Sequence, residues 1–181
     1  MEETAQDAMS KYTFKPYSPL FPSLFIKEKA RIAPNFHFPA SIEHVGSTAV
    51  PGLGGKGIID IAIAVEKDCM EEAKSKLQEI GYEFRPSFST PDRFYFITYL
   101  PDPEENSRRY HIHLTYPESK EWKELIGFRD YLRTHPEALE EYANIKKQAA
   151  EIANQDGDQY RKMKEPILQK INAFIKGSNA K

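Results

Sequence analysis

Cysteine, glycine and long apolar runs are scarce in this sequence. The chain of 181 residues has one cysteine, Cys69, so it cannot form an internal disulfide or a zinc site built from cysteines. No apolar run approaches the ~20 residues needed to cross a bilayer. The N-terminus is acidic and lacks the apolar region of a secretory signal. We therefore expect a cytoplasmic protein that does not bind or span a membrane.

Neither sign of charge is in large excess. The sequence has 25 lysine and arginine residues against 27 aspartate and glutamate residues, which gives a formal net charge of -2. A dedicated binder of duplex DNA normally carries a basic excess, so we expect no duplex DNA partner. A phosphorylated small molecule remains compatible, because a pocket needs only a few local cations. Nothing in the composition identifies a protein partner.

The pattern of apolar residues predicts one α+β domain. Helices are predicted over 23–32, 68–80 and three segments after residue 118, and strands over 41–45, 57–65, 82–84, 93–99 and 108–115. We divide the chain into an N-terminal arm that is partly disordered (1–20), an α+β core (21–117), C-terminal helices packed on that core (118–176) and a tail (177–181). The expected fold is a mixed β-sheet with flanking helices, followed by a C-terminal helical lobe.

A glycine-rich turn next to an unusual carboxylate is the strongest candidate site. Five of the nine glycines lie between residues 46 and 57, and Asp60 interrupts the apolar strand that follows. In such a turn Gly46, Ser47 and Thr48 could bind phosphate oxygens. Asp60 could then hold a Mg²⁺ that bridges the same phosphates. The alternatives are a helix cap for Ser47 and a buried partner for Asp60.

His111 and His113 form a second candidate site. Residues two apart on a strand point to the same face, so both imidazoles face one side. If that strand lies beside the strand of Asp60, the three side chains converge as a metal site or as a general base beside phosphate. A pair of half-exposed histidines on an edge strand is an equally weighted alternative.

Basic residues near these elements are candidates for phosphate ligands. They are Lys56, Arg85, Arg93, Arg108 and Arg109 in the core, and Lys146 and Lys164 in the C-terminal helices. Of these we select Lys56, Arg109 and Lys164, since most others have a solvated surface as the simpler explanation. The aromatic residues of 94–99 indicate a strand and not the alternation of basic and aromatic residues that binds single-stranded nucleic acid.

Four blocks of the sequence together resemble the GrpB family. They are His44–Leu53 with Lys56–Ile61, then Tyr110–Leu114, then Glu121-Trp122 with Phe128–Arg133, and finally Tyr142, Lys146, Tyr160 and Lys164. The resemblance runs from about residue 20 to 176. That family is placed in the nucleotidyltransferase superfamily, so the resemblance implies a nucleotidyltransferase-like sheet. It also implies a phosphate-binding turn at Gly46-Ser47 and a metal carboxylate at Asp60.

The resemblance implies a metal-dependent nucleotidyltransferase that uses a nucleoside triphosphate and an unknown acceptor. Mg²⁺ or Mn²⁺ is the expected cofactor, and Zn²⁺ is an alternative if His111 and His113 are ligands together with Asp60. The superfamily's second carboxylate falls at Ala62, however, and a two-metal mechanism needs both. Either the metal differs, or Glu43 or another acid substitutes, or the chain binds a nucleotide or phosphorylated metabolite without catalysis. A role as an interaction protein is a third hypothesis.

Overall fold

The computed structural model describes residues 14–152 and 156–178. The start of the expected arm, residues 1–13, and the end of the expected tail, residues 179–181, lie outside them. The last helix continues to Ser178, so the first two residues of the expected tail are helical. No proline interrupts that final turn, and Lys176 favours it by its charge. Within the described ranges no helix is both long and apolar enough to cross a membrane.

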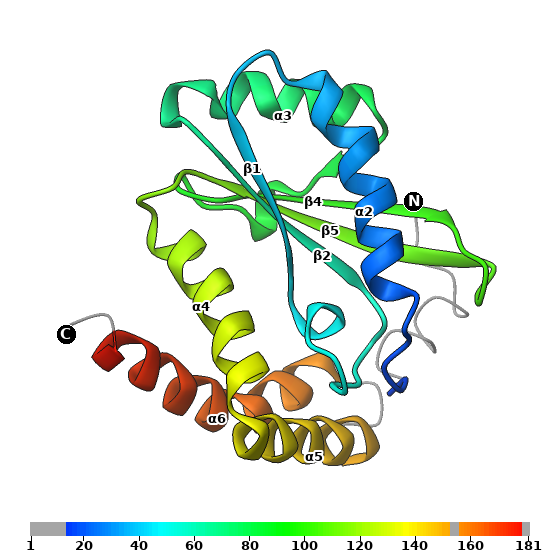
Figure 1. Ribbon diagram of the computed structural model, residues 1–181, viewed down its shortest axis with the longest axis vertical. Coiled ribbons are helices and arrows are strands. Elements are labelled where there is room, and N and C mark those ends of the chain that lie inside the picture. The colour runs from blue at the N-terminus through cyan, green and yellow to red at the C-terminus, as the bar shows by residue number, and fades with distance from the viewer. Residues whose placement is uncertain (1–13, 153–155, 179–181) are drawn as a thin grey trace.

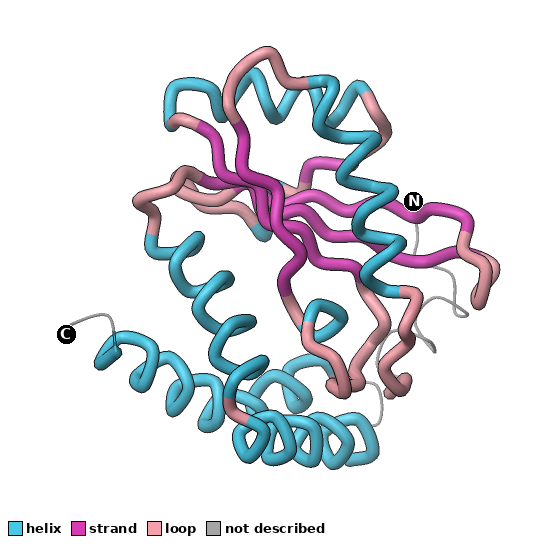
Figure 2. Tube along the Cα trace, viewed as in Figure 1, coloured by secondary structure: helices cyan, strands magenta, loops and turns pink. Residues whose placement is uncertain are grey.

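A five-stranded mixed sheet forms the centre of the molecule (Figure 2). Its strands are β1 (Ala40–Val45), β2 (Ile59–Val65), β3 (Glu83–Phe84), β4 (Phe94–Pro101) and β5 (Ser107–Thr115). Their spatial order is β1-β2-β5-β4-β3, in which β2 is parallel to β5 and the other pairs are antiparallel. The predicted α+β class with a mixed sheet is therefore confirmed, and β2 is an interior strand.

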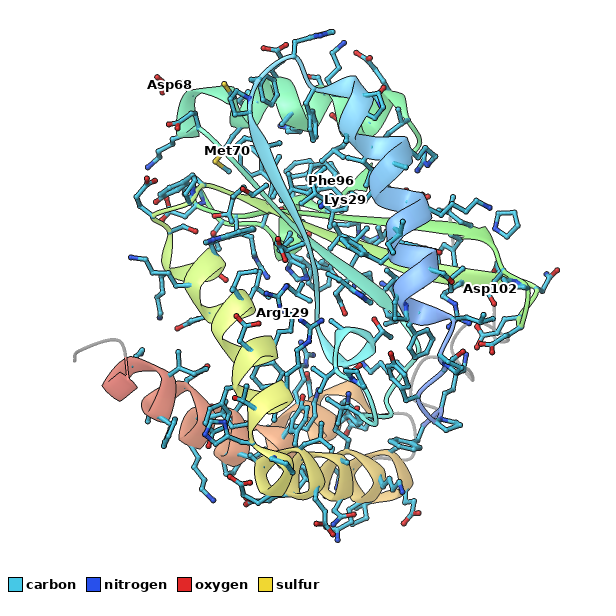
Figure 3. All side chains as sticks on the ribbon, in the orientation of Figure 1. Lys29, Asp68, Met70, Phe96, Asp102 and Arg129 are labelled. Carbon is cyan, nitrogen blue, oxygen red and sulfur yellow. The ribbon has the colours of Figure 1, made fainter. Side chains whose placement is uncertain are left out.

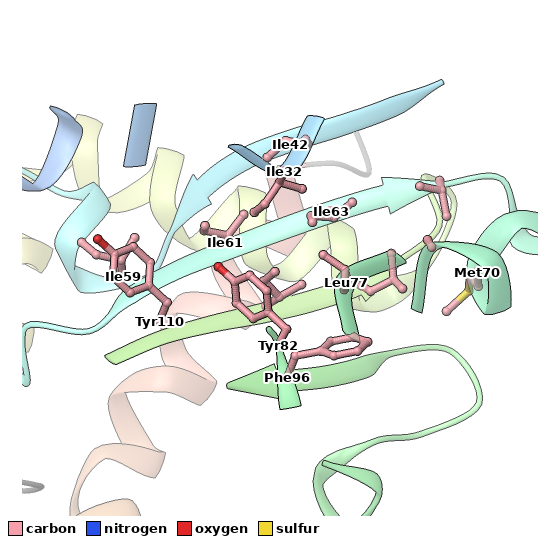
Figure 4. Packing of buried hydrophobic residues seen from close by; sticks show 14 of the residues in the cluster. Ile32, Ile42, Ile59, Ile61, Ile63, Met70, Leu77, Tyr82, Phe96 and Tyr110 are labelled. Atoms are coloured by element: carbon pink, nitrogen blue, oxygen red, sulfur yellow. The ribbon is translucent and has the colours of Figure 1, made fainter. Parts of the chain in front are cut away.

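Two helices cover one face of the sheet and bury its apolar side chains (Figure 4). They are α2 (Phe21–Ile32) and α3 (Met70–Glu79). Ile59, Ile61 and Ile63 point from β2 into this core and are fully buried. Burial of one such side chain contributes about 2 kcal/mol. Because successive strand residues alternate between faces, Asp60 and Ala62 point to the opposite face.

Three C-terminal helices lie together beyond that opposite face (Figure 1). They are α4 (Lys120–Thr134), α5 (Pro136–Ile152) and α6 (Gly157–Ser178). Ser119 caps α4 by accepting a hydrogen bond from the Trp122 amide, and Pro136 is the first residue of α5, as predicted. A second apolar cluster packs the helices on the glycine-rich segment through Val50, Leu53, Leu132, Tyr142 and Ile167.

Arg129 joins α4 to β1 across this interface (Figure 3). Its Nη1 donates hydrogen bonds to Glu43 Oε2 at 2.7 Å and to the His44 carbonyl at 3.1 Å. Its Nε donates to Asp130 Oδ1 at 2.8 Å. The guanidinium is almost fully buried, so it fixes the helical lobe relative to the sheet.

Candidate functional site

Asp60 and the two histidines meet on the sheet face opposite the core. The parallel pairing of β2 and β5 places Asp60 beside His111, and His113 follows two residues later on the same face. His111 Nδ1 and His113 Nε2 each lie 3.3 Å from the same oxygen, Asp60 Oδ1. The Asp60 side chain keeps 22% of its surface exposed. Asp60 thus has imidazole partners and still reaches the surface of the sheet.

The histidines determine which protonation states this cluster holds. Burial acts to raise the pKa of the Asp60 carboxyl, but the hydrogen bonds and charges of His111 and His113 outweigh it and hold that pKa far below its usual range. Burial lowers the pKa of His111, and the Asp60 carboxylate opposes that change only in part. The stable arrangement near neutral pH is therefore an ionised Asp60 beside a neutral His111.

Residues of β4 and its neighbouring loop orient the two imidazoles. The Tyr95 hydroxyl lies 2.7 Å from His111 Nδ1, and Arg93 Nη1 lies 3.5 Å from His113 Nδ1. Among the described residues, His111 Nε2 has no hydrogen-bond partner although it is buried. Sequence reasoning did not select Tyr95 or Arg93. Their strand is recognisable from its aromatic residues, but its pairing with β5 is not.

Gly46 brings the glycine-rich turn into contact with Asp60. Its φ angle is +73°, a conformation that residues with a Cβ rarely adopt. A Cβ at this position would lie 2.6 Å from Asp60 Oδ2. The turn that begins at Ser47 therefore approaches the carboxylate as closely as the backbone allows.

Gly55 opens space for two polar side chains in the same way. A Cβ on Gly55 would lie 2.5 Å from Lys146 Nζ and 2.8 Å from Ser47 Oγ. The hydroxyl of the turn and an ammonium from α5 therefore share one small region. From the sequence, Lys146 is a candidate for a cleft between the lobes, with a solvated helix face as the favoured alternative; in the structure it is 5% exposed.

Three lysines gather around this region, and we call Lys56, Lys146 and Lys164 the lysine cluster. The Nζ atoms of Lys56 and Lys164 lie 4.8 Å and 4.4 Å from the centroid of the Tyr160 ring. Lys146 Nζ lies 5.3 Å from the Tyr142 ring. Within the described residues neither Lys146 nor Lys164 forms an ion pair with a carboxylate.

Burial and the repulsion of neighbouring lysines make the ammonium groups of Lys146 and Lys164 acidic. Burial, then the charge of Lys164, lowers the pKa of Lys146 to about 7. Burial, then the charge of Lys56, lowers the pKa of Lys164 to about 8. The Asp60 carboxylate acts in the opposite direction on both lysines. Positive charge is thus concentrated next to Asp60 without being neutralised by it, which favours an anionic ligand.

Thr48 and His44 do not contribute side chains to this region. The Thr48 hydroxyl donates to the Ile58 carbonyl and lies 2.9 Å from His44 Nε2. His44 stacks on Phe25 under α2, and burial lowers its pKa to about 4. Thr48 was predicted as a phosphate ligand, but its hydroxyl is buried and already bonded because it holds the turn against the loop before β2.

Arg109 and Arg108 have different surroundings. Arg109 is on the same face as His111, and its guanidinium lies 5.9 Å from the ring of the cross-strand residue Tyr99. Arg108 points to the other face, where it is bound by Asp102 at 2.5 Å and donates to the Gly57 carbonyl. Arg109 thus remains a candidate ligand, and Arg108 fixes the β4–β5 hairpin.

The donor atoms of Asp60, His111 and His113 do not form a ready metal site. One carboxylate with two imidazoles is a donor set for Zn²⁺, Mn²⁺ or Fe²⁺ more than for Mg²⁺. In this arrangement, however, a ring nitrogen of each histidine faces Asp60 Oδ1 as a hydrogen-bond partner. Across residues 14–152 and 156–178, no group of three or more histidine, cysteine, aspartate or glutamate side chains is arranged to hold a metal ion. The predicted metal ligation therefore remains a prediction.

Comparison with known sequences identifies the family. A family model described as GrpB protein matches residues 11–173. The chain belongs to the GrpB family. It is 33% identical over 171 residues to a UPF0157 protein of Halalkalibacterium halodurans, covering 93% of this chain and 83% of the relative. It is also 33% identical over 158 residues to a UPF0157 protein of Pseudomonas aeruginosa, covering 86% of this chain but 64% of that relative.

A solved structure shows the same GrpB fold. The crystal structure of conserved protein GrpB from Enterococcus faecalis superimposes with a TM-score of 0.79 at 27% sequence identity. The match covers 93% of this chain and 100% of the other. A more distant match, 28% identical over 159 residues, is to a dephospho-CoA kinase of Mycobacterium leprae. It covers 73% of this GrpB chain and 38% of the kinase.

Proposed function

We propose that this GrpB-family chain binds the polyphosphate group of a nucleoside triphosphate at the lysine cluster. The observation that carries the proposal is the placement of Lys146 beside Ser47 of the glycine-rich turn, with Lys164 of a second helix close enough for its charge to act on Lys146. A buried ammonium is unfavourable unless an anion compensates it. Lys146 and Lys164 near one hydroxyl suit a ligand with several adjacent negative charges.

A second candidate function, nucleotidyl transfer, is favoured by the closeness of Asp60, His111 and His113 to that cluster. In this reaction an acceptor hydroxyl oxygen forms a bond to the α-phosphorus of the triphosphate. The bond from that phosphorus to the bridging oxygen breaks, and pyrophosphate leaves. The hydroxyl proton passes to a general base, for which the imidazoles of His111 and His113 are the candidates. Metal dependence is part of this second candidate and needs its own test.

The surroundings of position 62 support binding without catalysis as the alternative. Ala62 is fully buried where the superfamily pattern has its second carboxylate. Glu43 lies opposite Ala62 on β1 and is the acid that the sequence suggests as a substitute. Its carboxylate accepts the 2.7 Å hydrogen bond from Arg129, so it is already engaged.

Isothermal titration calorimetry measures triphosphate binding whether or not transfer takes place. The ligand panel is the four ribonucleoside triphosphates together with dephospho-CoA and CoA, which the mycobacterial relative's name suggests. We expect at least one to bind, and we expect Lys164→Met to weaken it about tenfold or more, the effect of losing a hydrogen bond to a charged group. Lys147→Met is the matched control on α5, because Lys147 is exposed. Equal loss in both variants, or no binding to the wild type, would reject the proposal.

Pyrophosphate release, measured on the same proteins, tests the second candidate. The assay is run with Mg²⁺, Mn²⁺ or Zn²⁺ and with a chelator, in the presence of candidate hydroxyl acceptors. Release that is lost in Asp60→Asn but retained in Lys147→Met supports transfer. Triphosphate binding with no release under any of these conditions supports the binding module instead.

A further inference from the structure

A second cationic region lies along β4 and β5, near the histidine pair. The charges of Arg109, Arg93 and Arg85 all act on the Tyr95 hydroxyl, which adjoins His111. Arg85 is paired with Glu83, but Arg93 and Arg109 have no ion pair with any carboxylate of the described residues. This sheet face thus has two arginines whose charge is not neutralised by a carboxylate of residues 14–152 or 156–178.

The same two arginines have unsatisfied donors. Arg93 Nε and Arg109 Nε are buried, and no hydrogen-bond partner for either lies in the described part of the chain. An unsatisfied buried donor costs about 1–3 kcal/mol, a cost that an incoming acceptor such as a phosphate oxygen removes. Arginine suits this role because its planar donors match phosphate geometry.

Exposed aromatic rings lie near these arginines. Phe88 is 52% exposed, and its ring centroid lies 5.9 Å from that of Tyr95. Tyr99 is 47% exposed and lies across from Arg109 on β4. The antiparallel pairing of β4 with β5 therefore places Tyr99 beside Arg109, a juxtaposition of aromatic and basic residues that the sequence of 94–99 alone did not indicate. Rings of this kind stack on nucleobases.

The site formed by these residues is named the arginine–aromatic cluster, and it consists of Arg85, Phe88, Arg93, Tyr95, Tyr99 and Arg109. We propose that it binds a second nucleotide, with the base on the exposed rings and a phosphate on Arg93 and Arg109. This inference rests on the proposed function in one respect: the two nucleotides would approach each other at Asp60. The second nucleotide is either a free mononucleotide or the terminal residue of a single-stranded nucleic acid, because both present the same base and phosphate.

The test uses adenosine monophosphate and a fluorescein-labelled single-stranded oligoadenylate as probes. Calorimetry measures the first and fluorescence anisotropy the second, each in a Lys146→Met/Lys164→Met background so that probe phosphate cannot occupy the lysine cluster. Phe88→Ala removes an exposed ring, and Arg109→Gln removes one guanidinium. The controls are Phe174→Ala, another exposed phenylalanine, on α6, and Lys27→Gln, a surface charge on α2.

We expect Phe88→Ala to weaken binding of at least one probe by about fivefold or more, the effect of losing one base-stacking contact. We expect Arg109→Gln to reduce the salt dependence of oligoadenylate binding by about 0.7 in the slope of log K against log salt. Both control variants should bind as the parent does. Because Phe88 is on the surface, its variant keeps the test valid even if Arg109→Gln does not fold.

The outcomes also separate the two sources and the two proposals. Oligoadenylate binding more than tenfold tighter than the monophosphate identifies a strand end, and similar affinities identify a mononucleotide. Binding of neither probe, or binding that Phe88→Ala and Arg109→Gln both leave unchanged, overturns the inference. Triphosphate affinity of otherwise wild-type Phe88→Ala protein reports on the lysine cluster alone, so failure of the proposed function is recognised separately.

Discussion

Lys146→Met should stabilise the ligand-free protein while weakening triphosphate binding. Lys146 is 5% exposed, and burial with the charge of Lys164 lowers its pKa from 10.5 to about 7. A lysine with this change in pKa opposes folding by roughly 4 kcal/mol at pH 7. Methionine fills a similar volume but loses the contact with the Tyr142 ring, worth about 1 kcal/mol. We expect a net gain of about 3 kcal/mol in the free energy of unfolding.

The pH dependence of that gain follows from the direction of the change in pKa. The folded protein binds the Lys146 proton more weakly than the unfolded chain does, so stability from this site rises as pH increases from about 7 toward 10. The advantage of methionine is therefore largest at or below pH 7 and disappears near pH 10.

Thermal unfolding followed by circular dichroism at pH 7 and pH 10 measures this prediction. A gain of about 3 kcal/mol corresponds to a rise in Tm of roughly 6–12 °C for a domain of this size. Lys147→Met, one residue further along α5 and exposed, should show no such rise. A Lys146→Met protein that is less stable at pH 7, or whose gain is the same at both pH values, would show that the lysine is not a strained ligand-binding group.

The remaining predictions concern the turn, the carboxylate, the interface and the lysines. Gly46→Ala should lower the free energy of unfolding by about 1–3 kcal/mol in urea, because its Cβ would meet Asp60 at a φ of +73°; a change below ~0.5 kcal/mol contradicts that contact. The low pKa of Asp60 gives stability that is present above its unfolded pKa and lost as pH falls below ~4. The free energy of unfolding of Asp60→Asn should therefore fall less steeply with decreasing pH than that of the wild type. Arg129→Met should cost about 2 kcal/mol in urea, since it leaves a β1 carboxylate and a carbonyl without their donor, and Arg129→Lys should recover part of it. Triphosphate affinity should be higher at pH 6 than at pH 9, because Lys146 and Lys164 lose their protons near pH 7 and 8. Equal affinities at the two pH values, measured by calorimetry, would show that these lysines do not bind the phosphates.

The elements of the sheet were predictable because local composition determines them. The apolar, β-branched run of β2 reads as an interior strand, and the structure buries it between β1 and β5. Gly81, with φ +100°, ends the helix region of α3 at the place where glycine is favoured. Such features depend on residues that are neighbours in the sequence.

The composition of the site was only partly predictable, because it depends on pairing between distant segments. The meeting of Asp60 with His111 needs a parallel register that no local pattern specifies. Lys146 looks like a residue of a polar helix face until α5 is docked on Gly55. Arg93 and Tyr95 join the histidines only through the antiparallel pairing of β4 with β5.

Thr48 shows the opposite case. Its place in the motif predicts a phosphate ligand, but in the fold its hydroxyl is already hydrogen-bonded within the protein. Its hydroxyl lies between His44 and the Ile58 carbonyl, so the side chain stabilises the turn. Ser47, one residue earlier, points instead toward the lysine cluster. Neighbouring residues of one turn thus differ in role because the 3₁₀ turn directs their side chains to different faces.

Triphosphate binding at the lysine cluster is tested most directly by a structure of the protein with a non-hydrolysable nucleoside triphosphate analogue. We predict phosphate oxygens at hydrogen-bond distance, about 2.7–3.2 Å, from Lys146 Nζ, Lys164 Nζ and Ser47 Oγ. An analogue whose phosphates bind elsewhere, with the lysine cluster contacting only solvent, would contradict it.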